Sequence, residues 1–541
     1  MSLGSRQRKA VSMRLINHIL AAVFVGAFTI TMAWPSSAAF AADPAFQVSA
    51  GERQLFLDDV GIGRIENLRR TMHQPAKKGA VIRIQPGLEG LEQHSIQLST
   101  PPHWDPGQKI WKCWTNTPAP VRYASAYWES HDGLHWTRPV IGQVEYKGSR
   151  QNNFIFFEMK GRRYGPGCVV YDATDPDPNR RYKSLYKSED TDSEGNVYGL
   201  PTTSLAVSPD GIHWTGLDIE VPNKDTVTFS FHESAHLYIV PARDYDRYGR
   251  CVMLTTSNDF ENWTHHGVVF AADERDQEIA RQRIETHLTD PTLADPEFSI
   301  PSMYNGQVYR MGMFGYEGLY IGLPMMFYRS GRVPNDWDGF DDMELPEAIL
   351  RDVRRNGDWT GVFEVQLACS RDLKNWKRLG DRRPFIGPSR IGSGAYDTLC
   401  VGDPGYPAVR GDELWFYYAG IKSYAYISLR KRDQGAICLA VLRRDGFISL
   451  DAGEQEGTIQ TESFMLPGSK LFVNVDAPKG KLRVEVLNGA GQVVAQSEPL
   501  GGDLLSEPVK WAEGDIAKMK DKNVSLRFTL SNAQFYSYWL E

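Results

Sequence analysis

Cysteine is scarce in this chain, and no two cysteines stand close enough in the sequence to form a C-x-x-C pair. The absence of such a pair excludes a zinc ribbon and a thioredoxin-type redox motif. Most of the cysteines lie in apolar, strand-like runs, so we expect buried free thiols, with one or two disulfides as the alternative in an exported protein. The six are Cys113, Cys168, Cys251, Cys369, Cys400 and Cys438.

An excess of positive charge is also missing. The net charge is −7 over 541 residues, so nothing in the composition indicates a nucleic-acid partner. With 41% hydrophobic and 23% charged residues, the chain has the composition of a soluble globular protein. The chain is too long to fold around one ordinary hydrophobic core, so its length predicts either two domains or one large repeat fold.

Only the N-terminus has a long hydrophobic run. Residues 16–34 are mostly apolar, follow a basic stretch around Arg8 and precede a small-x-small sequence at 39–41. This order is typical of a secretory signal peptide. We therefore expect residues 1–41 to be a cleaved signal peptide, and the protein to be exported to the periplasm or the extracellular space with no other membrane contact. An uncleaved anchor is the alternative, because the run is close to spanning length.

One phrase, Ser-x-Asp-x-x-x-Trp, is repeated through the chain. Each copy follows an apolar run of β type, and a degenerate copy without the tryptophan follows later in the sequence. Asp and Gly suit a tight turn, so each unit is predicted to be a strand, a turn and a strand, with the Trp packing the second strand. The complete copies are Ser130–Trp136, Ser208–Trp214, Ser257–Trp263 and Ser370–Trp376.

Repeated strand–turn–strand units are typical of a β-propeller. The uneven spacing of the copies favours an enzyme-type propeller with long insertions, and the degenerate copy makes five blades. The alternative is an irregular β protein in which the phrases are only hairpin turns. We expect the propeller, which would be the catalytic domain, to occupy residues 50–452. A charged segment at 273–288, which has neither Gly nor Pro, is predicted to be a helix in a surface insertion.

The pattern changes near residue 457. Short segments alternate apolar and polar residues and are separated by Gly, Pro and Asn, which predicts antiparallel strands. Their extent fits a small β-sandwich over residues 457–541. The predicted fold class is therefore all-β, with a five-bladed β-propeller followed by a C-terminal β-sandwich.

This order of domains resembles the glycoside hydrolases of families 32, 43, 62, 68, 117 and 130. Several phrases are similar to exported bacterial proteins that resemble the family 32 N-terminal domain. They include Leu55–Asp59, His73–Pro75, Gly148–Asn153, Tyr316–Gly322, Gly411–Tyr418 and Asp445–Leu450. The resemblance implies a glycosidase with a carbohydrate substrate. The Asn-Asp-Pro-Asn-Gly, Arg-Asp-Pro and Glu-Cys motifs of invertases are absent, so their catalytic triad is not transferred to this chain.

Glycoside hydrolysis needs two carboxyl groups across the scissile bond, one protonated and one ionised. In a propeller they would lie where the innermost strands begin, away from the repeated turns. Glu317 is the candidate general acid, because burial among aromatic residues favours a protonated carboxyl; its alternative is a carboxylate that caps a bulge or pairs with an arginine. Asp397 is the candidate base or nucleophile, and an aspartate that holds a turn is its alternative. Glu89 or Glu92 could supply the first-blade acid.

Further residues are candidates for binding the sugar. Glu233 lies between His232 and His236, but a strand would put it on the opposite face from both histidines, so no metal site is predicted. Arg243 could hold a hydroxyl or carboxylate of the substrate. The amide of Asn153 suits sugar hydroxyls, and turn capping is its structural alternative. The rings of Tyr316 and Trp104 could stack on sugars, and packing is their structural alternative. These remaining candidates are Glu92, Asn153, Tyr316 and Trp104.

We therefore expect a secreted glycoside hydrolase that cleaves a poly- or oligosaccharide by carboxylate acid/base chemistry in the propeller funnel. A glycan phosphorylase is a close variant that would need a basic phosphate site. A non-catalytic glycan-binding propeller is the main alternative, because a fold does not imply a function, and a lyase-like or scaffold propeller is a third. No cofactor is predicted, a structural Ca²⁺ stays open, and we expect a monomer.

Overall fold

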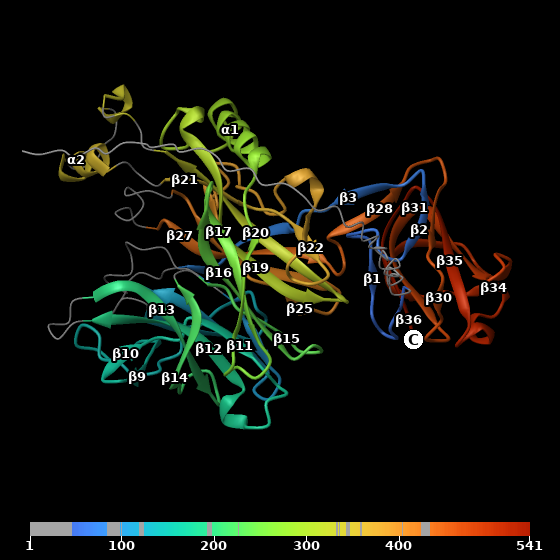
Figure 1. Cartoon of the computed structure of the whole chain (residues 1–541), viewed down its shortest axis with the longest axis horizontal. Helices are drawn as coiled ribbons and strands as arrows, with labels where there is room; N and C mark the ends of the chain where they lie inside the picture. The colour runs from blue at the N-terminus through green and yellow to red at the C-terminus, as the bar shows by residue number, and fades with distance from the viewer. Residues whose placement is uncertain are drawn as a thin grey trace, which may run out of the picture. The chain divides into compact units, whose positions relative to one another are not determined.

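The computed structural model describes residues 46–83, 98, 100–117, 124–191, 197–224, 227–331, 334, 336–341, 347–356, 360–402, 404–423 and 433–541. Within these ranges the chain is almost entirely β-structure (Figure 1). The expected signal peptide and the candidate acids Glu89 and Glu92 lie outside them. No helix in this described part is both long and apolar enough to cross a membrane.

Three antiparallel sheets have four strands each, and their strands lie side by side in sequence order. The first contains β5 (His103–Asp105), β6 (Ile110–Thr117), β7 (Ala124–Ser130) and β8 (Phe154–Ile155). The second contains β11 (Cys168–Tyr171), β12 (Tyr182–Thr191), β13 (Val197–Ser208) and β14 (Thr215–Lys224). The third contains β15 (Ser230–His232), β16 (Leu237–Asp246), β17 (Gly249–Ser257) and β18 (Thr264–Phe270). This order needs only hairpin connections, as the repeated strand–turn–strand pattern predicted.

A fourth sheet has ten strands and joins distant segments of the chain. β4 (Ala76–Arg83) pairs with β27 (Gly435–Arg443), so the beginning of the described chain supplies a strand beside one of the last in this sheet. Its other strands are β19 (Tyr304–Tyr316), β20 (Leu319–Ser330), β21 (Gly361–Val365), β22 (Ala368–Ser370), β23 (Trp376–Arg378), β24 (Cys400–Val401), β25 (Ala408–Arg410) and β26 (Glu413–Ile421). A short hairpin of β9 (Phe157–Met159) and β10 (Arg162–Tyr164) stands apart.

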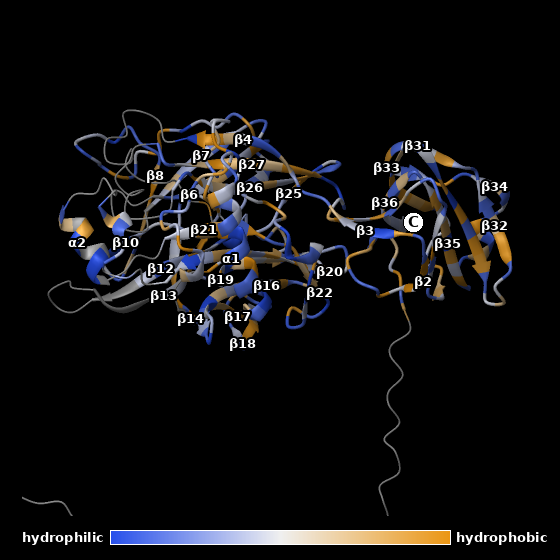
Figure 2. Cartoon of the chain, turned by 90° about the horizontal axis from the view of Figure 1, so that it is seen from above, coloured by the Kyte–Doolittle hydropathy of each residue, from blue (hydrophilic) through white to orange (hydrophobic). Residues whose placement is uncertain are grey.

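The C-terminal sheet has twelve strands. Buried and partly exposed residues alternate along β35, as expected for a strand with one face in the core. Hydrophobic and hydrophilic stretches both appear on the strands of this sheet in Figure 2. From residue 457 on, it contains β29 (Gly457–Thr461), β30 (Phe464–Met465), β31 (Leu471–Asn488), β32 (Val493–Ser497), β33 (Leu500–Pro508), β34 (Trp511–Gly514), β35 (Asn523–Ser531) and β36 (Ala533–Leu540).

Four further strands of this sheet come from the segment that was predicted to be propeller. β1 (Gln54–Leu55), β2 (Ile62–Glu66) and β3 (Arg69–Met72) pair with β36, β29 and β28 respectively, and β28 (Ile448–Ala452) also pairs with β36. Strands from both sides of the predicted boundary at 457 therefore share one sheet. Local alternation shows that a strand exists, but it does not show which distant strand becomes its partner.

In all four repeated phrases the aspartate accepts two backbone N–H groups of the turn that follows it. In the copy that begins at Ser208, the serine hydroxyl accepts two backbone N–H groups, and Asp210 Oδ1 accepts two more. The indole of Trp214 donates to the carbonyl of Gly211 at 3.0 Å. The turns follow β7, β13, β17 and β22. We call the end of each sheet at which its repeated turn lies the repeat-turn end, and the other end of the sheet the opposite end. The structural role predicted for the turn aspartates is confirmed.

Replacing Asp372 by alanine is expected to lower the free energy of unfolding by about 1–2 kcal/mol. The backbone N–H groups of Lys374 and Asn375 and the Asn375 side chain all donate to this carboxylate. Urea unfolding of Asp372→Ala measures the loss. The control is Asp295→Ala, at an exposed aspartate that forms no hydrogen bond within the described residues. Equal stability of the two variants would contradict the role assigned to the turn.

The helix predicted at 273–288 is confirmed as α1 (Glu274–Thr289). Asp273 and Asp276 each accept the other's backbone N–H, which is the reciprocal arrangement of a capping box. One face of α1 is not at the surface, because Ala280 and Ile284 are buried in the same cluster as residues of β19. A second helix is α2 (Glu347–Asn356).

The expectation of buried free thiols is also confirmed. All six cysteines are free and buried. Burial raises the pKa of Cys251 to about 12, so this thiol stays protonated and unreactive at neutral pH.

Candidate functional site

Glu317 lies in the two-residue turn between β19 and β20. Its carboxylate accepts the backbone N–H of Arg53 at 2.9 Å and pairs with Arg444 at 3.3 Å. Because Tyr320 pairs with Ser370, this turn stands at the repeat-turn end of its sheet. The arginine partner is the alternative that the sequence left open for Glu317, and its role as general acid stays a prediction.

Asp397 is buried, with 2% of its surface exposed. Its carboxylate lies 2.6 Å from Lys77 Nζ and accepts the hydroxyl of Tyr418 at 2.8 Å. The carboxylate is thus engaged by a lysine and a tyrosine, and its role as base or nucleophile stays a prediction.

The two predicted acids also lie at opposite ends of β26. Arg444, the partner of Glu317, donates its backbone N–H to the carbonyl of Asp412, just before β26 begins. Asp397 packs against Gly420 near the last residue of the strand. Eight residues of extended chain span about 26 Å, whereas hydrolytic carboxyl groups lie about 5–10 Å apart. These two side chains cannot act as a catalytic pair.

Glu233 is exposed in the turn between β15 and β16. Since Tyr238 pairs with Ser257, this turn too is at the repeat-turn end, away from the expected site. The neighbouring histidines form hydrogen bonds with Ser and Thr hydroxyls. Over the described ranges, no three His, Cys, Asp or Glu side chains come together as metal ligands.

Three other predicted sugar-binding residues have different surroundings. Asn153 is buried and donates to the carbonyl of Tyr127 at 2.8 Å, so it holds backbone. Tyr316 is buried and donates to Asp445 at 2.7 Å. Trp104 is 36% exposed and alone of the three keeps an accessible ring.

Arg243 lies in β16 and pairs with Val252, which is near the start of β17. Arg243 is therefore toward the opposite end of its sheet. Its guanidinium carbon is 4.5 Å from the centre of the Tyr309 ring. The guanidinium carbons of Arg250 and Arg310 are each 5.7 Å from the same ring centre. Three arginines from three strands thus surround one tyrosine.

Arg329 belongs to the same group, which we call the arginine cluster: Arg243, Arg250, Arg310 and Arg329. Burial and then the charge of Arg243 lower the pKa of Arg250, and the charge of Arg329 adds to this effect. One NH of Arg250 donates to Gln307 Oε1 at 2.8 Å. The buried Nε atoms of Arg250, Arg310 and Arg329 have no hydrogen-bond partner in the described structure.

Only Arg243 in this cluster was predicted from the sequence. The others come from β17, β19 and β20, and a register shift between Val308 and Arg310 shows a bulge that re-aims side chains at this point. Arg250 carries a usable signal, because it stands at the start of the strand that ends in a repeated turn.

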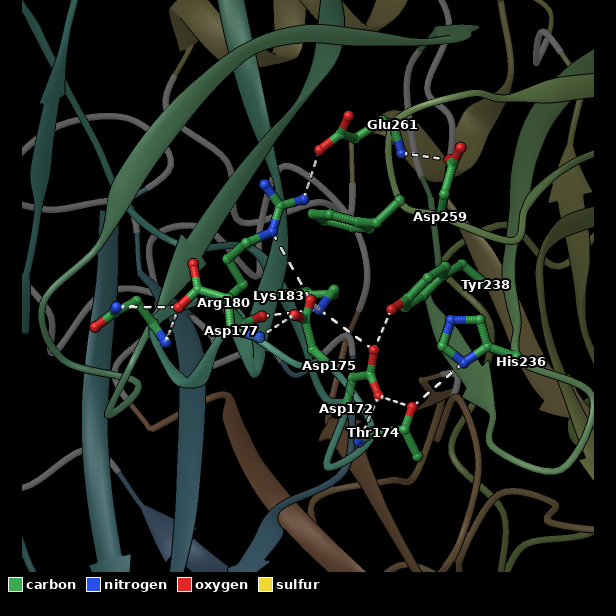
Figure 3. Close-up of polar contacts among 12 residues, drawn as sticks. Asp172, Thr174, Asp175, Asp177, Arg180, Lys183, His236, Tyr238, Asp259 and Glu261 are labelled. Carbon is green, nitrogen blue, oxygen red and sulfur yellow. Dashed lines mark hydrogen bonds and ion pairs between the residues drawn. The ribbon is translucent and has the colours of Figure 1, made fainter.

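A second polar group is buried between β12 and β16 (Figure 3). Lys183 is fully buried, and its Nζ lies 2.6 Å from Asp175 and 3.3 Å from Asp172. Asp172 also accepts the hydroxyl of Tyr238. Each charge in this group has an opposite charge beside it. It is therefore a structural ion network that links the second and third sheets.

No family model matches the chain, and no curated protein matches it. Solved structures that are similar to it include glycoside hydrolases. One described only as a glycoside hydrolase is 13% identical with a TM-score of 0.40, covering 68% of this chain and 92% of its own.

Two others have named activities. A family 32 β-fructofuranosidase of Bombyx mori is 10% identical with a TM-score of 0.36, over 86% of this chain and 93% of its own. An exo-β-1,3-galactanase from Phanerochaete chrysosporium is 9% identical with a TM-score of 0.36, over 87% of this chain and 99% of its own. Because these values are low, neither activity nor site residues are transferred from them.

Proposed function

We propose that this protein is an exported glycoside hydrolase, with its site in the funnel of a five-bladed β-propeller that precedes a C-terminal β-sandwich. The observation that carries the proposal is the position of the arginine cluster. Arg243, Arg250 and Arg329 lie at the ends of their sheets away from the repeated turns. In a propeller enzyme, substrate-binding groups gather at that end, where the innermost strands begin.

The strand pairing supports five blades. The three four-stranded sheets would be the first three blades, and the ten-stranded sheet would hold two more. In that sheet β19 to β23 form one antiparallel unit that contains a repeated turn, and β24 to β27 form the other with β4 as its outer strand. A strand from the beginning of the chain that completes the last blade would close the ring and remove its free edges.

Of the two carboxyl groups that hydrolysis needs, this proposal names one, Glu89 or Glu92, and the other of these two residues would contact the sugar. Both precede the first strands of the first sheet in the sequence, and both lie outside the described residues. Arg243 would hold the substrate. Glu317 and Asp397 are no longer part of the proposal, because each is engaged with a basic side chain elsewhere.

A non-catalytic glycan-binding propeller is the second candidate. It is favoured by the fact that both candidate acids in the described part of the chain, Glu317 and Asp397, form ion pairs far from each other. The same funnel would then bind a glycan without cleaving it.

The test is the release of reducing sugar by the mature chain from a panel of arabinans, xylans, fructans and algal polysaccharides. We expect Glu89→Gln or Glu92→Gln to lower kcat/KM by at least about 10²-fold, as for loss of a general acid or base. Glu317→Gln is the matched control and should leave kcat/KM unchanged, because its carboxylate serves a turn.

Two outcomes would overturn parts of this proposal. Loss of activity in a folded Glu317→Gln variant would restore that residue as an acid. Glycan binding by the wild type without release of reducing sugar from any substrate would favour the binding propeller.

A further inference from the structure

We propose that the arginine cluster binds an oxyanion, so that the ligand of this site carries, or is accompanied by, a negatively charged oxygen group. The inference rests on the proposed function and deepens it, because it names the substrate class of the same site. The candidate groups share one chemistry: a carboxylate, a sulfate ester or a phosphate, each with two or more oxygens that accept from a guanidinium.

The first argument is the absence of partners. Elsewhere in the chain, arginines at similar depth face carboxylates: Arg283 lies 3.0 Å from Glu364, and Arg378 lies 2.5 Å from Asp276. Within the described structure, no carboxylate lies within ion-pair distance of Arg250, Arg310 or Arg329. A guanidinium remains protonated at every physiological pH. The positive charges of Arg250, Arg310 and Arg329 are therefore not neutralised by a carboxylate of the described residues.

The second argument is the crowding of these charges. Three guanidinium carbons lie within 5.7 Å of one tyrosine ring centre, and that of Arg250 is also 5.5 Å from the ring centre of Phe327. Aromatic faces attract cations and orient them, but they do not cancel charge. Burial and then the charges of Arg243 and Arg329 lower the pKa of Arg250, so these like charges repel one another in a partly buried place. A bound anion would convert this repulsion into attraction.

The third argument is geometry. All four arginines are partly exposed, so a ligand from solvent can reach them. They come from β16, β17, β19 and β20, so the cluster is held by the rigid sheets and not by one mobile loop. Phe327, beside Arg250, is itself held by stacking on Phe363 at 4.1 Å. Arginine in such a fixed arrangement suits the bidentate recognition of carboxylate, sulfate or phosphate.

Two sources could supply the oxyanion. It could be borne by the glycan, as the carboxylate of a uronic acid or as a sulfate ester, or it could be free inorganic phosphate. In both cases the arginines would make the same charge-assisted hydrogen bonds. The two sources differ in whether the sugar must be present for the anion to bind.

The test is isothermal titration of the mature chain with inorganic phosphate, inorganic sulfate, an oligogalacturonide and a neutral xylo-oligosaccharide. We expect at least one anionic ligand to bind, with affinity at least about 10-fold lower in Arg250→Gln and in Arg329→Gln, since each removes hydrogen bonds between charged groups. The control is Arg163→Gln, at an exposed arginine on β10, which should bind as the wild type does.

A second readout separates binding from structure. Without ligand, Arg250→Gln should have an unchanged Tm, because the removal of one of several like charges offsets the loss of its hydrogen bond to Gln307. A structural arginine would give a lower Tm instead. Arg329→Gln provides the same comparison in a different strand, so the proposal stays testable if one variant does not fold.

Each outcome has a meaning. Tighter binding of the oligogalacturonide than of free phosphate or sulfate would support a glycan-borne anion, and binding of phosphate alone would support the free ion. Absence of anion binding, or anion binding that Arg250→Gln and Arg329→Gln leave unchanged, would overturn the proposal. Anion binding without any glycan cleavage would remove the hydrolase proposal and leave this one standing.

Discussion

Replacing Lys183 by methionine is expected to lower the free energy of unfolding by about 3–5 kcal/mol. Lys183 is fully buried and lies between Asp172 and Asp175. Methionine fills a similar volume, so packing changes little, but the carboxylate of Asp172, which is 1% exposed, loses the positive charge beside it. An unpaired buried charge is among the few causes of so large an effect.

Urea unfolding monitored by tryptophan fluorescence would measure this loss. The matched control is Lys160→Met, because Lys160 pairs with Asp218 where both side chains are exposed. Exposed pairs contribute about 1 kcal/mol or less, so that variant should be nearly as stable as the wild type. Similar losses in both variants would show that the buried network does not stabilise the fold as inferred.

The same network predicts a dependence on acid. Burial raises the pKa of Asp172, but hydrogen bonds from Thr174 and Tyr238 and the charge of Lys183 outweigh it and hold that pKa below its ordinary value of 3.8. Because the folded-state pKa is lowered, the contribution of this group is complete above the unfolded pKa and is lost as the pH falls through the folded one. Lys183→Met should therefore begin acid unfolding at a higher pH than the wild type.

Replacing Asp445 by alanine is expected to cost a similar amount, about 3–5 kcal/mol. Asp445 is completely buried and lies in the turn between β27 and β28. Its carboxylate accepts from Arg53 and Tyr316 at 2.7 Å each and from Ser537 at 2.6 Å. The variant leaves the Arg53 guanidinium, which stacks 3.8 Å from the ring centre of Trp539, without an anionic partner.

Backbone conformation adds to the effect of this substitution. Asp445 has a φ of 62°, a left-handed conformation that aspartate and asparagine tolerate better than alanine. Asp445→Asn should therefore lose less stability than Asp445→Ala.

Glu317→Gln is the natural control, because this neighbouring acid pairs with a partly exposed arginine, Arg444, and should change stability by about 1 kcal/mol or less. Thermal and urea unfolding of the three variants would rank them. A larger loss of stability in Glu317→Gln than in Asp445→Ala would contradict the larger contribution assigned to the Asp445 carboxylate.

The surroundings of Asp445 also show which contacts of Glu317 could not be predicted from the sequence. Tyr316 and Glu317 looked like a site because aromatic residues and glycines surround them in the sequence. In the fold those features belong to a hairpin turn, where Tyr316 contacts Asp445 and Glu317 contacts Arg53 and Arg444. The partners of Glu317 are more than a hundred residues away in the chain, and no local sequence pattern predicts them.

The arginine cluster also depends on contacts that the sequence does not predict. Arg310 and Arg329 lie on neighbouring strands of one sheet, while Arg243 and Arg250 lie on neighbouring strands of another. Each pair could be placed by hairpin register, but the meeting of the two pairs around Tyr309 depends on how the sheets pack. Sequence alone placed only Arg243 in the site.

The sequence by itself determined the local elements of this protein. The Ser-x-Asp-x-x-x-Trp turns, the helix at 274–289 and the buried thiols follow from hydrogen-bonding side chains, capping residues and apolar runs that act within a few residues. The tertiary structure alone decided that β1 to β3 join the C-terminal sheet, that Glu317 and Asp397 bind basic side chains, and that four arginines converge. Those outcomes depend on contacts between distant segments, where long-range pairing and burial outweigh any local preference.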